Sequence, residues 1–272
     1  MNNFFQRLEP NTKGRDFVMG DIHAAYDLLD KAFIEVNFDV EVDCVISVGD
    51  LTDRGLWPLR CLDLLGKPWF HATRGNHEDM WLEIYKDGTF DEREYLGWKR
   101  NGLDWVENTD PAIMRLIIDE FRKLPIVTEL ETERGLVGFV HADIPHGMDW
   151  QTFTTKIQEG DEEVIHTALW GRDRVQRGDE SGVEGIGRVY VGHTPTANRQ
   201  MMRLGNLFYL DTAAVLHELK PESEGRLSFV RVDLQTILFD HGSSAKPVDA
   251  RDLRPEPPNL PFGNYALFAN QP

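Results

Sequence analysis

The chain has 272 residues, with 29 Lys and Arg against 46 Asp and Glu, and its formal net charge of -17 at pH 7 argues against nucleic acid bound through a broad basic face. Two cysteines, Cys44 and Cys61, are too few for a disulfide framework and fit a reducing compartment, and no apolar run is long enough to span a bilayer. We therefore expect a cytoplasmic protein without nucleic-acid or membrane partners, built as one large α/β domain or two small ones.

The first 90 residues alternate between strand and helix patterns. Apolar runs typical of strands occur at 15–21, 43–50 and 67–76. Segments with apolar residues at helical spacing follow them, at 24–38, 58–66 and 80–88. Such repetition favours βαβ units with a parallel core, and the run at 43–50 is apolar enough to be covered on both faces.

The second half of the chain has a different pattern. A helix is predicted at 110–124, where Asp110 is a plausible N-cap and Pro111 stands in the first turn. Beyond it, short strands with few helices between them are predicted at 126–130, 135–143, 187–195, 206–213 and 226–234. A second sheet that packs against the first is the natural inference.

Polar residues gather where the predicted strands end. In chain order they are Asp21, His23, Asp50, Asp53, Arg54, Arg74, Asn76, His77, Glu78, His141 and His193. One His in such a place is more often structural, but here five loops share the feature, and such loops meet at the carboxyl edge of an open sheet. Carboxylates, imidazoles and an amide oxygen suit divalent ions such as Mn, Fe, Zn or Mg.

These candidate ligands are too many for one ion, but they suit two ions that share a carboxylate. Asp50, on the middle strand, is the natural bridge. A water between two such ions loses its proton near neutral pH and becomes a nucleophile. Asn76 and His77 are adjacent and point in different directions, so Asn76 can hold a metal while His77, held by Asp53, gives a proton to the leaving oxygen.

The order of these motifs resembles the signature of the PPP-family metallophosphoesterases, and in particular the bacteriophage-lambda type serine/threonine protein phosphatases and their bacterial relatives. The matching motifs are GDIH at 20–23, GDLTDRG at 49–55, RGNHE at 74–78, VHAD at 140–143, LWGRDR at 169–174 and VGHTP at 191–195. The resemblance covers roughly residues 15 to 235. It implies a calcineurin-like α/β fold, with two mixed β-sheets packed as a sandwich flanked by helices.

Composition and the extent of the resemblance together give a domain division, and the resemblance implies a set of roles. The catalytic domain would span 15–240, between an N-terminal extension at 1–14 and a Pro-rich tail at 241–272 that is disordered or loosely docked. The implied ligands are Asp21, His23 and Asp50 for one ion, and Asp50, Asn76, His141 and His193 for the other. The implied proton donor is His77 backed by Asp53, and the implied phosphate-binding residues are Arg54, Arg172 and, as a third, Arg74.

Two divalent ions are thus expected, with Mn²⁺ first and Fe, Zn, Ni or Mg as alternatives. The family pattern has Gly at position 24, where this chain has Ala, which puts the local turn in doubt but removes no ligand. Trp98 and Trp105 are interpreted as a cap over the core, with a wall of the substrate groove as the alternative.

Three functions are compatible with these residues. The first is a phosphomonoesterase for phosphoserine and phosphothreonine in proteins, with phosphotyrosine as a further candidate. The second is a dinucleoside polyphosphate hydrolase of the same fold, a family that usually departs from the pair Asp53–Arg54 and from Glu78. The third is a binding module that kept the fold without the activity. The sequence does not indicate the oligomeric state.

Overall fold

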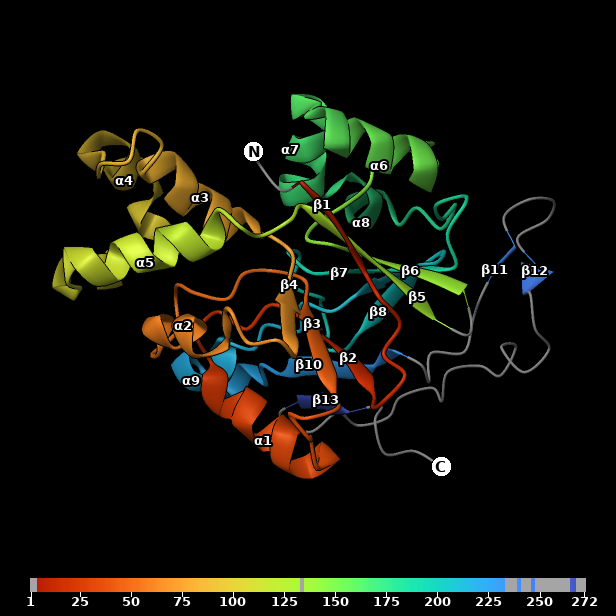
Figure 1. Ribbon diagram of the computed structural model, residues 1–272, viewed down its shortest axis with the longest axis horizontal. Coiled ribbons are helices and arrows are strands. Elements are labelled where there is room, and N and C mark those ends of the chain that lie inside the picture. The colour runs from red at the N-terminus through yellow and green to blue at the C-terminus, as the bar shows by residue number, and fades with distance from the viewer. Residues whose placement is uncertain (1–3, 133–134, 233–238, 241–245, 248–264, 268–272) are drawn as a thin grey trace.

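The computed structural model describes residues 4–132, 135–232, 239–240, 246–247 and 265–267, whose longer strands form two mixed sheets (Figure 1). The six-stranded sheet has the order β1-β5-β6-β7-β9-β8. Its strands are β1 (Phe5–Leu8), β5 (Val127–Thr132), β6 (Gly135–Val140), β7 (Arg188–Val191), β8 (Met202–Leu204) and β9 (Leu207–Tyr209). The five-stranded sheet has the order β13-β10-β2-β3-β4. Its strands are β2 (Asp16–Met19), β3 (Cys44–Ser47), β4 (Phe70–Ala72), β10 (Leu227–Arg231) and β13 (Tyr265–Leu267).

Helices flank both sheets. They are α1 (Tyr26–Val36), α2 (Cys61–Leu64), α3 (Asn76–Ile84), α4 (Glu92–Trp98), α5 (Pro111–Phe121), α6 (Trp150–Glu159), α7 (Glu162–Trp170), α8 (Asp173–Arg177) and α9 (Leu216–Leu219). In Figure 1, α3, α4 and α5 form one group beside the sheets, and α6, α7 and α8 form another. No helix in the described part of the chain is both long enough and apolar enough to cross a bilayer.

Alternation along the strands builds three apolar cores. In β2, Phe17 packs into the core under α1, whereas the next residue, Val18, faces the core between the sheets. In β6, Phe139 faces the same inner core and Val140 packs under α6 and α7. Because successive side chains of a strand point to opposite faces, both sheets are covered on both sides. This arrangement confirms the predicted sandwich of two mixed sheets flanked by helices.

The predicted helix start at Asp110 is confirmed. The Asp110 side chain accepts the backbone N–H of Ala112 at 2.7 Å, and Pro111 occupies the first helical position. Both features satisfy or remove backbone donors that a helix start leaves without partners. The buried face of α5, with Ile117 and Phe121, then packs into the core beside α3.

Both ends of the chain differ from the sequence expectation. Residues 5–8, expected in an N-terminal extension, form β1, which pairs parallel to β5 at the edge of the six-stranded sheet. Residues 265–267, expected in the tail, form β13, which pairs parallel to β10. The expected strand 226–234 ends as β10 at Arg231. Apart from β12 (Lys246–Pro247), which pairs with β11 (Phe239–Asp240), and β13, the tail lies outside the described residues. The domain boundaries stay predictions.

Parallel strands bring distant loops to one edge of the sandwich. β2, β3 and β4 run parallel to one another in one sheet, and β6, β7 and β9 do so in the other. The loops that leave their carboxyl ends are where open α/β sheets bind ligands.

Candidate functional site

The structure brings together ten of the eleven residues to which the sequence gave a role. Asp21 and His23 follow β2, Asp50, Asp53 and Arg54 follow β3, and Asn76 and His77 begin α3 after β4. His141 follows β6, His193 follows β7, and Arg172 lies in the turn between α7 and α8. Apart from Arg54 and Arg172, which are exposed, these side chains are buried, so the centre is a buried polar cluster.

Arg74 is the exception and corrects the prediction. Its guanidinium forms an ion pair with Asp79 at 3.4 Å and donates to the carbonyl of Leu124 at 3.3 Å. The side chain is therefore bound between α3 and the segment after α5, and no hydrogen bond or ion pair in the described residues joins it to another candidate residue. A guanidinium engaged in this way supports the fold, so we withdraw Arg74 as a phosphate-binding residue.

The backbone of the centre is strained. His23, Asp50, Asp53, Arg54 and His193 all have positive φ, at 43°, 54°, 70°, 66° and 66°. Residues other than Gly adopt this region at a cost of about 1–2 kcal/mol each, and such residues concentrate at functional sites.

Ala24 also lies in the left-handed region, with φ of 62°. The family's Gly at this position is therefore explained by the turn, which this chain keeps with Ala.

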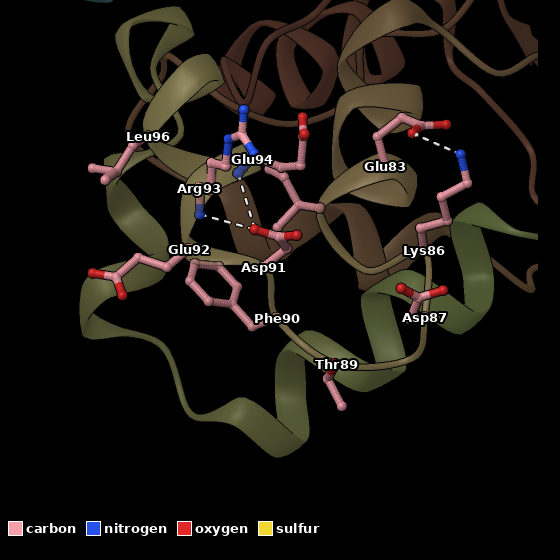
Figure 2. Close-up of a pocket in the computed structure, with 11 residues that line it drawn as sticks. Glu83, Lys86, Asp87, Thr89, Phe90, Asp91, Glu92, Arg93, Glu94 and Leu96 are labelled. Carbon is pink, nitrogen blue, oxygen red and sulfur yellow. Dashed lines mark hydrogen bonds and ion pairs between the residues drawn. The ribbon is translucent and has the colours of Figure 1, made fainter.

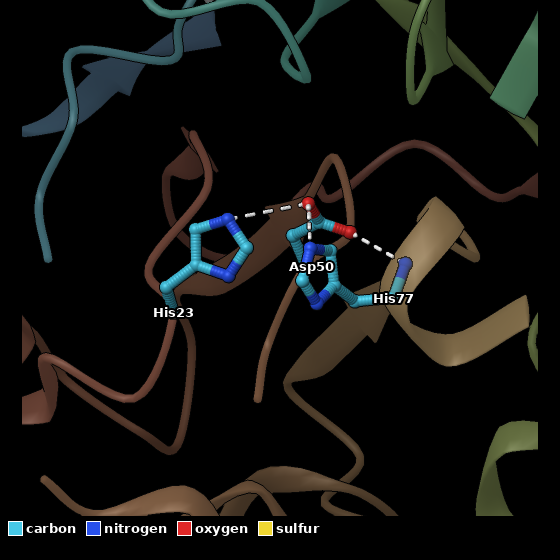
Figure 3. A group of neighbouring side chains, drawn as sticks. All are labelled: His23, Asp50 and His77. Atoms are coloured by element: carbon cyan, nitrogen blue, oxygen red, sulfur yellow. Dashed lines mark hydrogen bonds and ion pairs between the residues drawn. The ribbon is translucent and has the colours of Figure 1, made fainter. Parts of the chain in front are cut away.

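Asp50 lies between two imidazole rings, as Figure 3 shows. Its Oδ2 is 3.3 Å from His23 Nε2 and 4.0 Å from His77 Nε2. His23 Nδ1 donates to the carbonyl of Thr52 at 3.1 Å, and burial together with Arg54 lowers the pKa of His23 well below its ordinary value. The neutral ring thus presents the lone pair of Nε2 to a carboxylate oxygen, an arrangement that a cation stabilises.

A second group of candidate ligand atoms surrounds Asn76. Its Oδ1 is 2.8 Å from His141 Nε2 and 2.9 Å from His193 Nδ1. His141 Nδ1 donates to the carbonyl of Val48 at 2.8 Å, and burial lowers the pKa of His141, so its Nε2 carries a lone pair. His141 Nε2 and Asn76 Oδ1 are thus two acceptor atoms 2.8 Å apart, which matches the edge of a coordination shell, about 3 Å for bonds of about 2.1 Å.

Asp21 offers an oxygen without a protein donor. Its Oδ2 accepts the N–H of His193 at 2.9 Å, whereas its buried Oδ1 has no hydrogen-bond partner. A Cβ at Gly192 would lie 1.9 Å from that oxygen, so only Gly fits there. Burial, and then the charges of Asp211 and Asp50, raise the pKa of Asp21 well above its ordinary value. Buried carboxylates that repel one another need positive charge nearby, which divalent ions supply.

Asp50 belongs to both groups of candidate ligands. Atoms that could bind a metal in His23, Asp50 and His77, the last of which is the expected proton donor, lie within 4.8 Å of one another, and so do those of Asp21, Asp50 and His141. This sharing is consistent with Asp50 as the predicted bridge. The expected division assigned Asp21 and His141 to different ions, whereas here both belong to one of the two groups. Burial alone raises the pKa of Asp50, but the neighbouring histidines and Arg54 hold it well below its ordinary value, so the carboxylate is ionised.

His77 is held from one side. Its Nδ1 donates to Asp53 Oδ2 at 2.7 Å, and Asp53 Oδ1 accepts the indole N–H groups of Trp81 at 3.0 Å and Trp105 at 2.7 Å. Although burial lowers the pKa of His77, the carboxylates of Asp50 and Asp53 raise it above its ordinary value. Trp105 therefore does more than cap the core. The sequence could not show this, because Trp105 lies 52 residues from Asp53.

Both candidate phosphate-binding arginines face the centre. Arg54 donates through Nη1 to His23 Nε2 at 2.9 Å and through Nη2 to His77 Nε2 at 2.8 Å, and Arg172 Nε donates to His193 Nε2 at 3.0 Å. Because His77 Nε2 accepts here, it carries no proton in this arrangement, which conflicts with the raised pKa of the ring. The hydrogen bond describes the state with Arg54 on the ring. The charge of Arg54 lowers the pKa of His77, so protonation of Nε2 becomes more favourable when Arg54 moves away.

Glu78 links the loop after β3 to the loop after β4 through hydrogen bonds. It accepts the backbone N–H groups of Asp50 at 3.0 Å, Leu51 at 2.8 Å and Gly75 at 2.7 Å. A Cβ at Gly75 would lie 2.2 Å from Asp50 Oδ1, so the loop after β4 approaches the loop after β3 as closely as backbone allows.

Sequence reasoning missed Asp211, which follows β9 and is buried beside Asp21. Burial and the charge of Asp50 raise its pKa to about 6. The signal that could have identified it was an acidic residue at a strand end, in NLFYLDTA, the feature shared by the other candidates.

Two pockets open onto the centre. One of about 380 Å³ includes His23 and Arg54, and one of about 470 Å³ includes Arg172. A larger one of about 740 Å³ lies at α3 and α4, where acidic side chains such as Asp87 and Glu94 line it (Figure 2). It contains none of the candidate ligands.

Comparisons with known proteins agree with this geometry. A family model described as calcineurin-like phosphoesterase matches residues 17–205. The chain is 35% identical to serine/threonine-protein phosphatase 1 of Salmonella typhimurium over 78% of this chain and 92% of that protein. It is 32% identical to serine/threonine-protein phosphatase 2 of Escherichia coli over 84% of this chain and 97% of that protein. A crystal structure of a protein proposed to be a diadenosine tetraphosphatase has the same fold, with a TM-score of 0.58, 20% identity, and coverage of 85% of this chain and 94% of that one.

Proposed function

The chain belongs to the calcineurin-like phosphoesterase family, and we propose that it is a metal-dependent phosphatase that hydrolyses phosphoserine and phosphothreonine in proteins. The observation that carries this proposal is the pair of ligand groups sharing Asp50, beside two arginines that face them. The relatives named as serine/threonine-protein phosphatases support the substrate class, because the chain spans nearly their whole length.

The residues present fit two divalent ions. Asp21, His23, Asp50, Asn76, His141 and His193 would hold them. When bound, two such ions activate a water for attack on phosphorus and offset the charge of the phosphate. Mn²⁺ is the metal we propose, with Fe, Zn, Ni or Mg as alternatives, and a cytoplasmic location and activity on phosphotyrosine remain predictions.

Arg54 and Arg172 bind the phosphate oxygens. A guanidinium presents paired N–H donors that match two oxygens of a phosphate, and it stabilises the charge on them during transfer. Both side chains now donate to ring nitrogens of His23, His77 and His193, so the phosphate oxygens would replace neutral acceptors with charged ones. That exchange favours binding of the substrate over the resting contacts.

His77 delivers the proton to the leaving oxygen. Its Nδ1–H stays on Asp53, so Nε2 is the nitrogen that faces the substrate. When Arg54 moves onto the phosphate, Nε2 is released, and the carboxylates of Asp50 and Asp53 favour its protonation. A serine alkoxide is a strong base and needs this proton as the bond to phosphorus breaks.

Hydrolysis of dinucleoside polyphosphates is the alternative within the same fold. Asp53 and Glu78 bear on the choice, because that family usually lacks the Asp–Arg pair and this glutamate. Here both carboxylates are fully engaged, Asp53 with His77 and two indoles, and Glu78 with three backbone N–H groups. This engagement favours the phosphatase.

The test compares substrates on one metal-loaded preparation. The metal-depleted protein is reconstituted separately with Mn²⁺, Ni²⁺, Mg²⁺ and Zn²⁺ and assayed against a phosphoserine peptide, an aryl phosphate and diadenosine tetraphosphate. We expect the highest kcat/KM for phosphomonoesters, with the phosphopeptide hydrolysed. Efficient cleavage of diadenosine tetraphosphate without hydrolysis of the phosphopeptide would overturn the proposal in favour of the alternative.

A further inference from the structure

The pocket beside His23 and Arg54 extends beyond the residues that the proposed reaction uses. Its volume is about 380 Å³, and its other lining residues include Arg100, Arg199, Val215 and Leu219. Arg100 lies in the segment before Trp105, and Arg199 lies on the loop after His193, so residues far apart in the sequence line one pocket. The pocket is therefore continuous with the centre and offers both cationic and aliphatic side chains.

Neither of these arginines forms an ion pair with a carboxylate in the described residues, although Asp211, which also lines the pocket, is near enough for its charge to interact with that of Arg199. In a chain with 46 acidic and 29 basic residues, guanidinium groups usually pair with a carboxylate, as Arg15 does with Asp43 and Arg60 does with Asp30. Within the described residues, Arg100 makes no hydrogen bond or ion pair, and the Arg199 side chain makes one hydrogen bond, from Nη1 to the carbonyl of Thr196 at 3.1 Å. Both remain able to bind an anion.

The loops that carry them are attached to the centre. The backbone N–H of Arg54 donates to the carbonyl of Gly102 at 3.1 Å, which fixes the segment of Arg100 beside a phosphate-binding residue. The N–H of Thr196 donates to the carbonyl of Asp211 at 2.9 Å, which fixes the loop of Arg199 beside β9. A ligand whose phosphate lies on Arg54 thus has its adjoining groups next to this pocket.

We infer that this pocket is a second anion subsite, in which Arg100 and Arg199 bind an acidic side chain next to the phosphorylated residue of a peptide substrate. The inference rests on the proposed function, because it takes the position of the scissile phosphate from it. The aliphatic side chains of Val215 and Leu219 lie against the stem of the bound residue. The anion is a carboxylate or a second phosphate, since a guanidinium binds both.

The test measures selectivity among phosphoserine peptides of one length. Their flanking residues are Ala, Glu or a second phosphoserine, on either side of the scissile residue. For the metal-loaded wild type, we expect kcat/KM to be about tenfold higher with an acidic flank than with Ala, and this ratio to fall as salt is added. In the double variant Arg100→Ala/Arg199→Ala the ratio falls to about one, and Arg100→Lys/Arg199→Lys retains most of it.

The matched control is Arg93→Ala/Arg115→Ala, which removes two exposed arginines from α4 and α5 and so makes the same change in net charge. We expect this control variant to keep the wild-type ratio of kcat/KM between acidic and Ala flanks.

Glu and phosphoserine flanks separate the two kinds of anion, and a preference for either supports the subsite. Equal kcat/KM for acidic and Ala flanks in the wild type, or equal loss of the ratio in both double variants, overturns it. Because every peptide carries the scissile phosphoserine, a wild type that hydrolyses none of them refutes the proposed function instead.

Discussion

At the scale of single residues, His77 has the most specific role. Asp53 holds its Nδ1–H at 2.7 Å, which leaves only Nε2 for the substrate. A general acid matters in proportion to the basicity of the leaving group. We expect His77→Asn to lower the rate on a phosphoserine peptide far more than on p-nitrophenyl phosphate, whose nitrophenolate leaves without a proton. Steady-state kinetics on both substrates, with metal content measured in parallel, checks this.

The same residue predicts a pH dependence. The raised pKa of His77 keeps the ring protonated to higher pH than an ordinary histidine, so the wild-type rate on the peptide falls only as pH rises through that raised value. The high-pH limb should be missing in His77→Asn. Equal losses on the two substrates, or an unchanged limb in the variant, would show that His77 supports the centre without giving up a proton.

Arg172 gives a prediction that separates phosphate binding from metal binding. Within the described residues, the Arg172 side chain makes one hydrogen bond, to His193 Nε2. The other ring nitrogen of His193, Nδ1, is the one that faces Asn76. Arg172→Ala should lower kcat/KM by on the order of 10²–10³, the usual cost of losing one stabilising donor, while the metal content stays intact. Kinetics and elemental analysis of the same preparation check it. A rate equal to the wild type would place Arg172 outside the site.

The ligand residues were predictable because each is a polar side chain directly after an apolar strand. Their supporting contacts were not. Trp105 reaches Asp53 across 52 residues, and the direction of Arg74 depends on Asp79 and a carbonyl at the end of α5. Such contacts depend on tertiary packing, which no local pattern encodes.

At the scale of elements, α3 was predicted to begin at residue 80, and it begins at Asn76. The apolar period starts at Met80, whereas the first turn carries Asn76, His77 and Glu78, whose polar side chains are buried for function. A hydrophobic pattern cannot detect a turn that is buried against a polar site. The strand before it is correspondingly short, since β4 covers only residues 70–72.

Glu78 in this first turn holds the loop after β3. Gln has one oxygen where Glu has two, so Glu78→Gln places an amide N–H against a backbone donor of Asp50, Leu51 or Gly75. We expect the free energy of unfolding to fall by about 1–3 kcal/mol, the cost of leaving buried donors without partners. Urea unfolding measures it. A variant as stable as the wild type would mean that these loops hold their shape without Glu78.

At the scale of the whole molecule, the two-sheet sandwich followed from the strand pattern, but one edge strand of each sheet did not. The edge strands β1 and β13 lie in segments that composition assigned to an extension and a tail. Edge strands are held by backbone pairing as much as by side chains, so composition carries little information on them.

Removal of residues 241–272 tests the importance of one edge. The only described pairing of this segment with the catalytic sheets is that of Tyr265–Leu267 with β10. At about 1 kcal/mol for each backbone hydrogen bond, the truncated chain should lose no more than about 3 kcal/mol of stability and keep its metals. Thermal unfolding and metal analysis measure both. Failure of the truncated chain to fold would make the tail part of the domain.

The most direct test of the whole account is the number of metal ions needed for phosphopeptide hydrolysis. Metal-depleted protein is titrated with Mn²⁺ while bound metal and the rate on a phosphoserine peptide are measured, for the wild type, Asp50→Asn and His23→Asn. We expect the wild-type rate to reach its plateau at two ions per chain, Asp50→Asn to weaken both ions, and His23→Asn to weaken mainly one, because Asp50 belongs to both ligand groups. Full activity with chelator present, or two tightly bound ions and near-normal activity in Asp50→Asn, would contradict the shared-carboxylate centre.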